Sequence, residues 1–287
     1  MRKWYKYSLD PGLSRRTFAG IDQQYIDHAK AMGGYGADEA YRSKEDFFNK
    51  YFAGYHLGRL QCYDDFIRRH LNRQDSVLSI ASGRCVNELL LMDGGYNLTC
   101  SDLDISPELY RSTLSLFPDF KFIKLNILEN PAHEEYGVVL CFSLIYLFDD
   151  NKLDTFFQNV SKSLKAGGKL ILDSAGSPDN ALSYLIHDII LKWETYLLWA
   201  KRLLVAGARE GIIMQHFGFR RKDEEIIAVA QKAGLIYKEK KNYAWLTDFK
   251  RSYFLNKLIE GNKIFERILN IIGRRIPYIR MFCFEKR

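Results

Sequence analysis

The sequence predicts an α/β protein built on a mainly parallel sheet, and three observations lead to this fold class. A short apolar run, Val77–Ile80, is followed by a turn of small residues and then by a helical pattern. A second apolar run begins at Leu98 and ends on an acidic residue, Asp102. Apolar runs and helical patterns then alternate as far as Asp173, as is typical of a doubly wound sheet with helices on both faces.

The turn Ala81–Cys85 and the acid Asp102 together indicate a site for a nucleoside-containing ligand. Small residues between a strand and a helix let such a ligand approach the backbone, and an acid at the end of the next strand can accept both ribose hydroxyls. Gly83 and Asp102 are 19 positions apart, close to the roughly 20 that this geometry requires.

These stretches resemble the cofactor-binding half of the class I S-adenosylmethionine-dependent methyltransferases. The first motif of that family reads as an apolar pair, an acid, an apolar residue and a Gly-x-Gly-x-Gly turn. In this chain Ser79 stands in place of the acid, while Ala81 and Cys85 stand in place of the first and third glycines. The central glycine of the motif is retained as Gly83.

Three later stretches carry the resemblance further, over about residues 76–173. Residues 120–127 resemble the third strand, and residues 136–144 resemble the fourth strand with the loop beneath the cofactor. Residues 160–172 resemble the family's helix, Leu-Lys-Pro-Gly-Gly turn and fifth strand, with Ala166 in place of the proline. The resemblance implies a Rossmann-like seven-stranded methyltransferase sheet with helices on both faces. It also implies an enzyme with S-adenosylmethionine as its cofactor.

The resemblance further implies which residues bind the cofactor. Asp102 would accept the ribose hydroxyls; Asp104 is the rival, because Asp-Ile-Ser-Pro also fits the family's pattern, but the spacing favours Asp102. The adenine would lie at Asn126, where the family often has Asp, and at Ile127. The complete predicted set is Ala81, Ser82, Gly83, Arg84, Asp102, Leu103, Asn126, Ile127, Phe142 and Ser143.

Composition limits the class of protein. The formal charge of +7 favours an anionic partner, such as a phosphorylated substrate, a nucleic acid or an acidic membrane face. The five cysteines form no Cys-x-x-Cys pair, which predicts reduced thiols in a cytoplasmic compartment and no structural zinc. We expect no signal peptide, because Met1–Trp4 is followed by polar residues and no apolar h-region. We expect no spanning helix, because no run approaches about 18 apolar residues.

Helix signals place the remaining elements. Residues 1–42 predict an irregular arm with one helix near residues 22–31. Ser43–Asp46 approximates a capping box and predicts a long helix that ends near Leu71. Ser106, followed by proline and an acid, and Asp149–Asp150 each predict the start of a helix.

Two segments outside the resemblance predict helical insertions. Residues 179–205 predict one long helix with a wide apolar face, which we expect to be buried against the sheet domain; a substrate lid and a membrane-facing helix are the alternatives. Residues 248–275 predict a second, basic and partly amphipathic insertion. We expect both to line the acceptor side of the cleft, where Arg274 and Arg275 would meet an anionic acceptor or the inner face of a membrane.

The predicted organisation places a core between a cap and these insertions. The ranges are 1–72 for the N-terminal arm and helical cap, 73–178 for the cofactor-binding core, 179–215 for the first insertion or lid, 216–247 for the core continued, 248–276 for the second insertion and 277–287 for the closing strand.

Methyl transfer to an alcohol requires a general base, because the hydroxyl proton must leave as the new bond forms. The candidates are His216, Asp173 after the fifth strand and Tyr146 after the fourth. No group of His, Asp or Glu has the spacing of metal ligands, so no metal is expected. Phe142–Ile145 stands where amino-group nucleic-acid methyltransferases carry an Asn/Asp-Pro-Pro-aromatic motif, which makes a nucleic-acid substrate the less favoured reading.

The preferred hypothesis is an O-methyltransferase for a small-molecule or glycan acceptor, such as a surface polysaccharide. This acceptor class rests on analogy with bacterial polysaccharide methyltransferases that combine a similar core with helical insertions near a membrane. One alternative is a non-catalytic binding or scaffold protein with a degenerate methyltransferase fold. The other is an RNA methyltransferase, suggested by the charge of +7.

Overall fold

The computed structural model describes residues 2–8, 43–45, 63–83, 85–206, 212–243, 252–259, 262–273 and 279–287. These residues form a seven-stranded sheet and a separate two-stranded sheet. The strands of the larger sheet are β2 (Val77–Ile80), β3 (Leu98–Asp102), β4 (Lys121–Lys124), β5 (Tyr136–Cys141), β6 (Leu164–Ala175), β8 (Leu235–Tyr243) and β9 (Ile279–Lys286).

The strand order β4-β3-β2-β5-β6-β9-β8 confirms the predicted doubly wound sheet. Strands β4, β3, β2, β5 and β6 pair in parallel, whereas β9 runs antiparallel to both of its neighbours. The direction of winding changes between β2 and β5. In open α/β sheets ligands bind beyond the carboxyl ends of the strands at such a switch point, and the turn Ala81–Cys85 follows β2 at this position.

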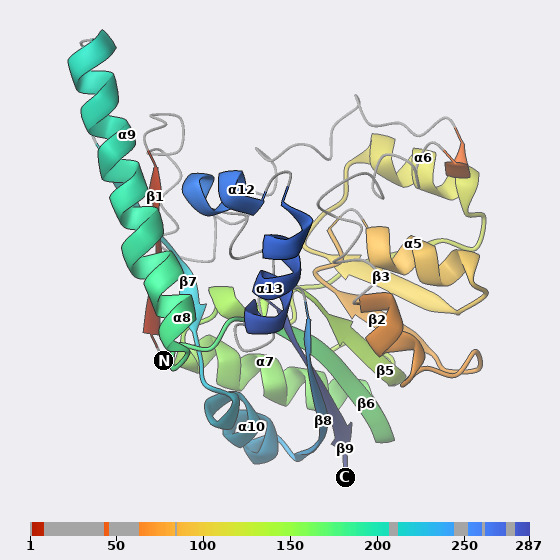
Figure 1. The fold of residues 1–287 in the computed structure, drawn as a ribbon. Helices are drawn as coiled ribbons and strands as arrows, with labels where there is room; N and C mark the ends of the chain where they lie inside the picture. The colour runs from red at the N-terminus through yellow and green to blue at the C-terminus, as the bar shows by residue number, and fades with distance from the viewer. Residues whose placement is uncertain are drawn as a thin grey trace.

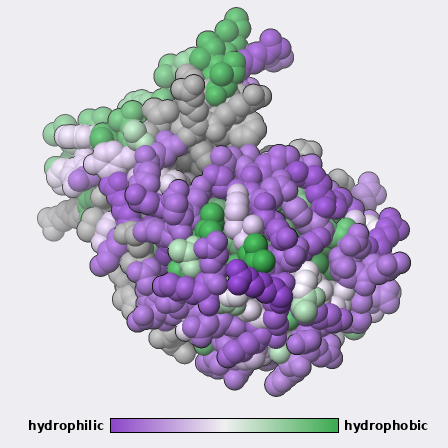
Figure 2. Space-filling model, turned by 90° about the horizontal axis from the view of Figure 1, so that it is seen from below, coloured by the Kyte–Doolittle hydropathy of each residue, from purple (hydrophilic) through white to green (hydrophobic). Residues whose placement is uncertain are grey.

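Helices cover both faces of this sheet (Figure 1). Helices α5 (Val86–Asp93) and α6 (Pro107–Leu116) pack on one face with helical residues 63–68, and α7 (Asp150–Ser163) and α10 (Asp223–Lys232) pack on the other. Seen from the side of α7 and α10, the body of the molecule is mainly hydrophilic (Figure 2). Strand β2 is buried along its whole length, which explains the uninterrupted apolar run in the sequence.

Two predicted helix starts are confirmed by their caps. The Ser106 hydroxyl accepts a hydrogen bond from the Leu109 N–H at 3.1 Å, and proline occupies the first turn of α6. The Asp149 carboxylate accepts from the Lys152 N–H at 2.9 Å at the start of α7. Each side chain satisfies a backbone donor that has no partner inside its helix.

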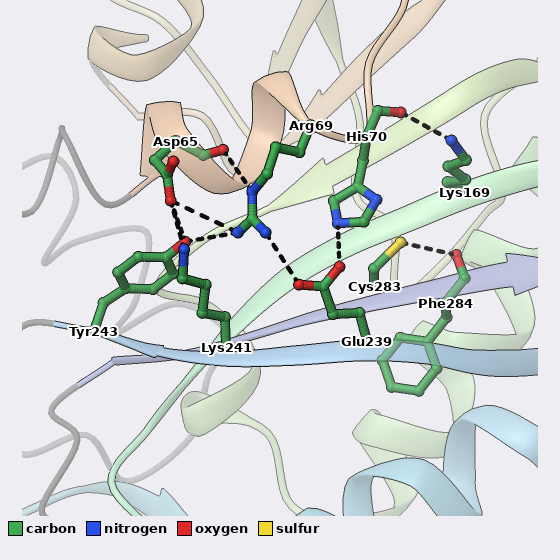
Figure 3. A network of polar contacts seen from close by, with 9 residues as sticks. All are labelled: Asp65, Arg69, His70, Lys169, Glu239, Lys241, Tyr243, Cys283 and Phe284. Carbon is green, nitrogen blue, oxygen red and sulfur yellow. Dashed lines mark hydrogen bonds and ion pairs between the residues drawn. The ribbon is translucent and has the colours of Figure 1, made fainter. Parts of the chain in front are cut away.

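A network of polar contacts joins helical residues 63–68 to β8 (Figure 3). The Arg69 guanidinium, just after this helix, donates to the Tyr243 hydroxyl at 3.0 Å and to the Glu239 carboxylate at 3.3 Å. The Tyr243 hydroxyl donates to the Asp65 carboxylate at 2.6 Å, and this bond lowers the pKa of Asp65 below its ordinary value. Helical residues 63–68 are thereby fixed against the sheet.

The smaller sheet pairs β1 (Arg2–Ser8) with β7 (Ile213–Arg220) in antiparallel register. The prediction of an irregular arm is therefore wrong for residues 2–8, because a strand about 210 positions further along the chain provides the hydrogen-bonding partner. The helix expected near residues 22–31, and residues 46–62 of the expected long helix, lie outside the described residues.

The first insertion is one continuous helical rod, as predicted. It consists of α8 (Ala181–Tyr184), the π-helical segment η3 (Leu185–Ile190) and α9 (Leu191–Ala206). Asp188 in η3 forms ion pairs with Arg2 at 3.5 Å and Arg220 at 3.6 Å, so the rod is held against both strands of the smaller sheet. No helix in the described part of the chain is long and apolar enough to cross a membrane.

The second insertion is also helical, and it is attached to the first. It contains α12 (Tyr253–Ile259) and α13 (Lys263–Gly273), while Arg274 and Arg275 lie outside the described residues. The buried carboxylate of Glu194 in α9 accepts hydrogen bonds from the Ser252 hydroxyl and, at 3.0 Å, from the Phe254 N–H at the start of α12. Glu194 thus caps a helix of the other insertion.

The expected burial of the first insertion's apolar face against the sheet domain is wrong. In α9 the exposed fractions are 63% for Trp193, 55% for Leu197 and 84% for Leu204. Near the start of the rod, Ile186 packs with Ile259 and Leu269 of the second insertion. The rest of α9 projects beyond the sheet domain (Figure 1).

A buried cation joins β9 to α10. The Arg280 guanidinium, 1% exposed, forms an ion pair with Asp223 and donates to the carbonyl oxygens of Ala175 and Arg221, each at 2.8 Å. The Asp223 carboxylate also accepts from Lys240. Although burial raises the pKa of Asp223, the two cations outweigh burial and hold this pKa below its ordinary value.

We predict that Asp223→Asn lowers the free energy of unfolding by about 3–5 kcal/mol, because it leaves a buried guanidinium without its counter-ion. The stability provided by a carboxylate with a lowered pKa is present above about pH 4 and is lost as the pH falls through the pKa of the folded state. Urea unfolding at pH 7 and pH 3 measures both effects. The exposed Asp93→Asn, which removes the partner of Lys44, is the control and should change stability by less than about 1 kcal/mol. Equal losses for the two variants would contradict the assignment.

Candidate functional site

The turn between β2 and α5 has an unusual backbone conformation at three alternating positions. The φ angles are 53° at Ala81, 56° at Gly83 and 56° at Cys85. All three values lie in the left-handed region, which glycine adopts freely but which costs other residues about 1–2 kcal/mol. The conformation of a three-glycine turn is therefore present although two of the glycines are absent. Arg84, also predicted for this site, lies outside the described residues.

Asp102 connects this turn to the neighbouring strand. Its carboxylate accepts a hydrogen bond from the Gly83 N–H at 2.9 Å and another from the Leu103 N–H at 2.7 Å. Burial raises the pKa of Asp102 above its ordinary value, although both N–H donors act in the opposite direction. The rival Asp104 is exposed and pairs with Lys124 at 2.7 Å. Asp102 is thus the carboxylate in contact with the turn.

Serine side chains hold the start of the turn against β3. Ser82 donates to the carbonyl oxygen of Ser101 twice, from its N–H at 2.9 Å and from its hydroxyl at 3.1 Å. The Ser101 hydroxyl donates to the carbonyl oxygen of Ser79 at 2.8 Å. The turn therefore has a fixed position relative to the ends of β2 and β3.

A pocket beside the turn contains five of the predicted cofactor residues. Asn126 lies in its wall, and its amide group is held by Glu129, which accepts at 2.8 Å, and by the Leu128 N–H, which donates at 3.2 Å. The other wall residues are mostly apolar, as is usual in pockets that bind small molecules. The pocket is lined by Ile80, Ala81, Asp102, Leu103, Leu125, Asn126, Ile127, Leu128, Leu144 and Phe148.

The loop after β5 forms another part of the site, and Asp173 determines its position. Ser143 has a φ of 58°, and its N–H donates to the Asp173 carboxylate at 2.5 Å. The other carboxylate oxygen accepts from the Tyr63 hydroxyl, and the Tyr63 ring stacks on Phe142 with centroids 4.6 Å apart. Asp173, predicted as a general base, thus has both oxygens engaged in positioning the loop and the helical cap.

The other two base candidates, Tyr146 and His216, lie beside the smaller sheet. Tyr146 belongs to η2 (Ile145–Leu147), directly after the β5 loop, and its ring is 6.1 Å from that of Trp4 on β1. His216 on β7 lies against Tyr5 of β1, with ring centroids 5.6 Å apart. Gly218, two residues further on, packs so closely against the Tyr146 backbone that a Cβ would not fit. The segments that carry Tyr146 and His216 are therefore in contact with each other, whereas Asp173 contacts Tyr63 and Ser143.

Two site residues were missed from the sequence, Tyr63 and Glu88. The Glu88 side chain on α5 is buried, accepts from the Ser79 hydroxyl at 2.6 Å and has one oxygen with no hydrogen-bond partner among the described residues. Ser79 stands where the resembled family has an acid, and α5 brings the Glu88 carboxylate into contact with it. An acid among leucines at the start of this helix was the available signal. Tyr63 gave none, since its partners are 79 and 110 positions away.

Burial raises the pKa of Glu88 to about 7. Because the unfolded chain releases this proton near pH 4.5, the free energy of unfolding should fall as the pH rises from about 4.5 to 7. The contribution is about 3 kcal/mol, since one pKa unit corresponds to ~1.4 kcal/mol. Glu88→Gln should abolish this loss, while the exposed Glu108→Gln should follow the native chain in urea unfolding at pH 5 and 7.5. Parallel curves for native chain and Glu88→Gln would refute the raised pKa.

Within the described residues, no group of three or more His, Cys, Asp or Glu side chains is placed to hold a metal ion. Four of the five cysteines are described, and all four are buried free thiols. The site is thus composed of backbone donors, carboxylates, one amide and aromatic rings.

No known protein-family profile matches the sequence, and no curated protein matches it significantly. Solved structures do match. Magnesium protoporphyrin IX methyltransferase from Synechocystis PCC 6803, with bound SAH, aligns with a TM-score of 0.54 and 11% identity over 93% of this chain and 100% of that one. The 1,6-didemethyltoxoflavin-N1-methyltransferase of Burkholderia thailandensis, with bound 1,6-didemethyltoxoflavin and S-adenosylhomocysteine, is also similar. It aligns with a TM-score of 0.52 and 12% identity over 84% of this chain and 86% of that one.

A third similar structure is phosphoethanolamine N-methyltransferase 2 of Haemonchus contortus, in complex with phosphomonomethylethanolamine and S-adenosylhomocysteine. Its TM-score is 0.55 at 14% identity, over 90% of this chain and 60% of that one. The three likenesses each cover most of this chain. The chain therefore has the fold of the class I S-adenosylmethionine-dependent methyltransferases.

Proposed function

We propose that the chain is an S-adenosylmethionine-dependent methyltransferase that methylates an oxygen of a small-molecule or glycan acceptor. The observation that carries the proposal is the turn after β2, which is left-handed at Ala81, Gly83 and Cys85 and hydrogen-bonded to Asp102 at the end of β3. A turn held in this way leaves room for a ligand to approach the backbone at the switch point of the sheet.

Asp102 is suited to bind the ribose in this proposal. A carboxylate offers about four lone-pair positions, and Asp102 uses one on each oxygen for the N–H groups of Gly83 and Leu103. The remaining positions can accept the two ribose hydroxyls. The adenine is then proposed to lie at the pocket beside Asn126 and Ile127, whose other wall residues are mostly apolar.

S-adenosylmethionine supplies a methyl group already activated by its sulfonium. The residues of the chain must hold the acceptor oxygen in line with that methyl group, roughly 3 Å away, and must remove its proton. We propose that His216 or Tyr146 takes this proton. Tyr146 lies in η2, directly after the β5 loop, and η2 contacts β7, the strand that carries His216. Asp173 stays the third candidate base; its carboxylate also accepts from the Ser143 N–H and the Tyr63 hydroxyl and so positions the loop that carries Phe142 and Ser143.

The acceptor is proposed to be anionic, and the protein is proposed to act in a cytoplasmic compartment. Exposed cations on the two insertions, such as Lys201 and Lys257, support an anionic acceptor. The free thiols of the described cysteines support a reducing compartment. The three similar structures act on chemically different acceptors, so the acceptor class rests on the insertions of this chain.

We predict that the chain binds S-adenosylmethionine and that Asp102→Ala lowers the affinity by ~10-fold or more. Loss of charge-assisted hydrogen bonds to the ribose corresponds to about 1.5–3 kcal/mol. Isothermal calorimetry with S-adenosylmethionine and S-adenosylhomocysteine measures the effect, and circular dichroism checks that the variant is folded.

Asp104→Ala is the matched control, because this neighbouring acid pairs with Lys124 at the surface. Its affinity should equal that of the native chain. No binding by the native chain at millimolar cofactor would contradict the proposed function. A large loss of affinity for Asp104→Ala with none for Asp102→Ala would instead show that Asp104, and not Asp102, binds the ribose.

A further inference from the structure

The two insertions carry most of the large hydrophobic side chains that the described surface exposes. On α9 Trp193, Tyr196, Leu197 and Leu204 are spaced as i, i+3, i+4 and i+11, which places these four exposed residues on one face of the helix; Leu198 and Leu203 are exposed as well. Their exposed fractions run from 41% to 84%. Such a stripe facing water is unusual on a single domain and marks an interaction surface.

The second insertion repeats this pattern. On α13, Ile264, Ile268 and Ile271 are exposed at i, i+4 and i+7, while Phe265 and Leu269 on the other side pack against the first insertion. On α12, Phe254 and Leu258 are exposed at i and i+4. Hydrophobic residues gather on the projecting parts of the molecule, in contrast to its hydrophilic body (Figure 2).

The charges beside these stripes all have one sign. In the described parts of α9, α12 and α13, every charged side chain that is exposed is cationic, namely Lys201, Lys257, Lys263 and Arg267. The acids Glu194 and Glu266 are buried and half-buried, respectively. Helices with an apolar face bordered by lysine and arginine are typical of segments that lie in the plane of a membrane surface.

We propose that α9, α12 and α13 dock this protein on a bilayer that contains anionic lipids. The apolar stripes enter the boundary between headgroups and acyl chains, and the four cations meet the lipid phosphates and carboxylates. A second copy of the chain is the poorer occupant, because a symmetric contact through the same surface would bring like charges together. The docked protein would hold its methyl-transfer site near a membrane-bound acceptor.

The test is sedimentation with vesicles of phosphatidylcholine alone and of phosphatidylcholine with about one third phosphatidylserine. Native protein should partition onto the anionic vesicles and much less onto the neutral ones. Each cation removed, as in Lys263→Gln or Arg267→Gln, should weaken binding by about fivefold. Two double variants remove parts of the stripes: Trp193→Ser with Leu204→Ser, and Ile264→Ser with Ile268→Ser. Each should bind the anionic vesicles at least ~10-fold more weakly than the native protein.

Leu114→Ser on α6 and Ile236→Ser on β8 are matched controls, since each is 36% exposed outside the insertions, and they should bind like the native chain. Equal binding of the stripe variants and the controls overturns the proposal. So does a stable dimer in ultracentrifugation that the stripe variants break while no vesicle binding is seen. Cofactor affinity should stay native in all variants, so this result is independent of the proposed methyltransferase function.

Discussion

The hydrogen bond from the Gly83 N–H to the Asp102 carboxylate is the contact on which the site depends. It joins the turn after β2 to the end of β3, and it holds that turn in a conformation that Ala81 and Cys85 adopt only at a cost. The buried Glu88 beneath the turn adds to that cost when it is ionised. The packing of β2 and the serine contacts to β3 must therefore offset this strain, as is common where a backbone is shaped for a ligand.

The sheet domain around this turn and the two insertions differ in how they are held together. The sheet domain is closed by buried contacts such as the Arg280–Asp223 pair and the Asp173 bridge between the β5 loop and Tyr63. The first insertion is joined to the smaller sheet by polar contacts, among them Asp188 with Arg220. The outer faces of both insertions stay apolar and cationic. The proposed cofactor site and the proposed docking surface together fit an enzyme whose acceptor is presented at an interface.

The sequence was informative wherever local rules govern the chain. The apolar run of β2, the Ser106 cap and the spacing from Gly83 to Asp102 predicted their structures because each depends on neighbours within about 20 residues. The pairing of β1 with β7 could not be predicted, because neither strand is stable without its distant partner. Nor could the exposure of the α9 stripe, since periodicity identifies an apolar face but does not say what covers it. The roles of the predicted site residues stay predictions, although the structure gives the places of all of them except Arg84.

A crystal structure of the chain with S-adenosylhomocysteine is the most direct measurement of the central claim. The expected result is a ligand whose ribose hydroxyls lie about 2.6–3.0 Å from the Asp102 carboxylate. Its adenine should lie at Asn126 and its methionine portion along the turn from Ala81 to Cys85. An empty turn at saturating ligand, or a nucleoside bound away from Asp102, would contradict it.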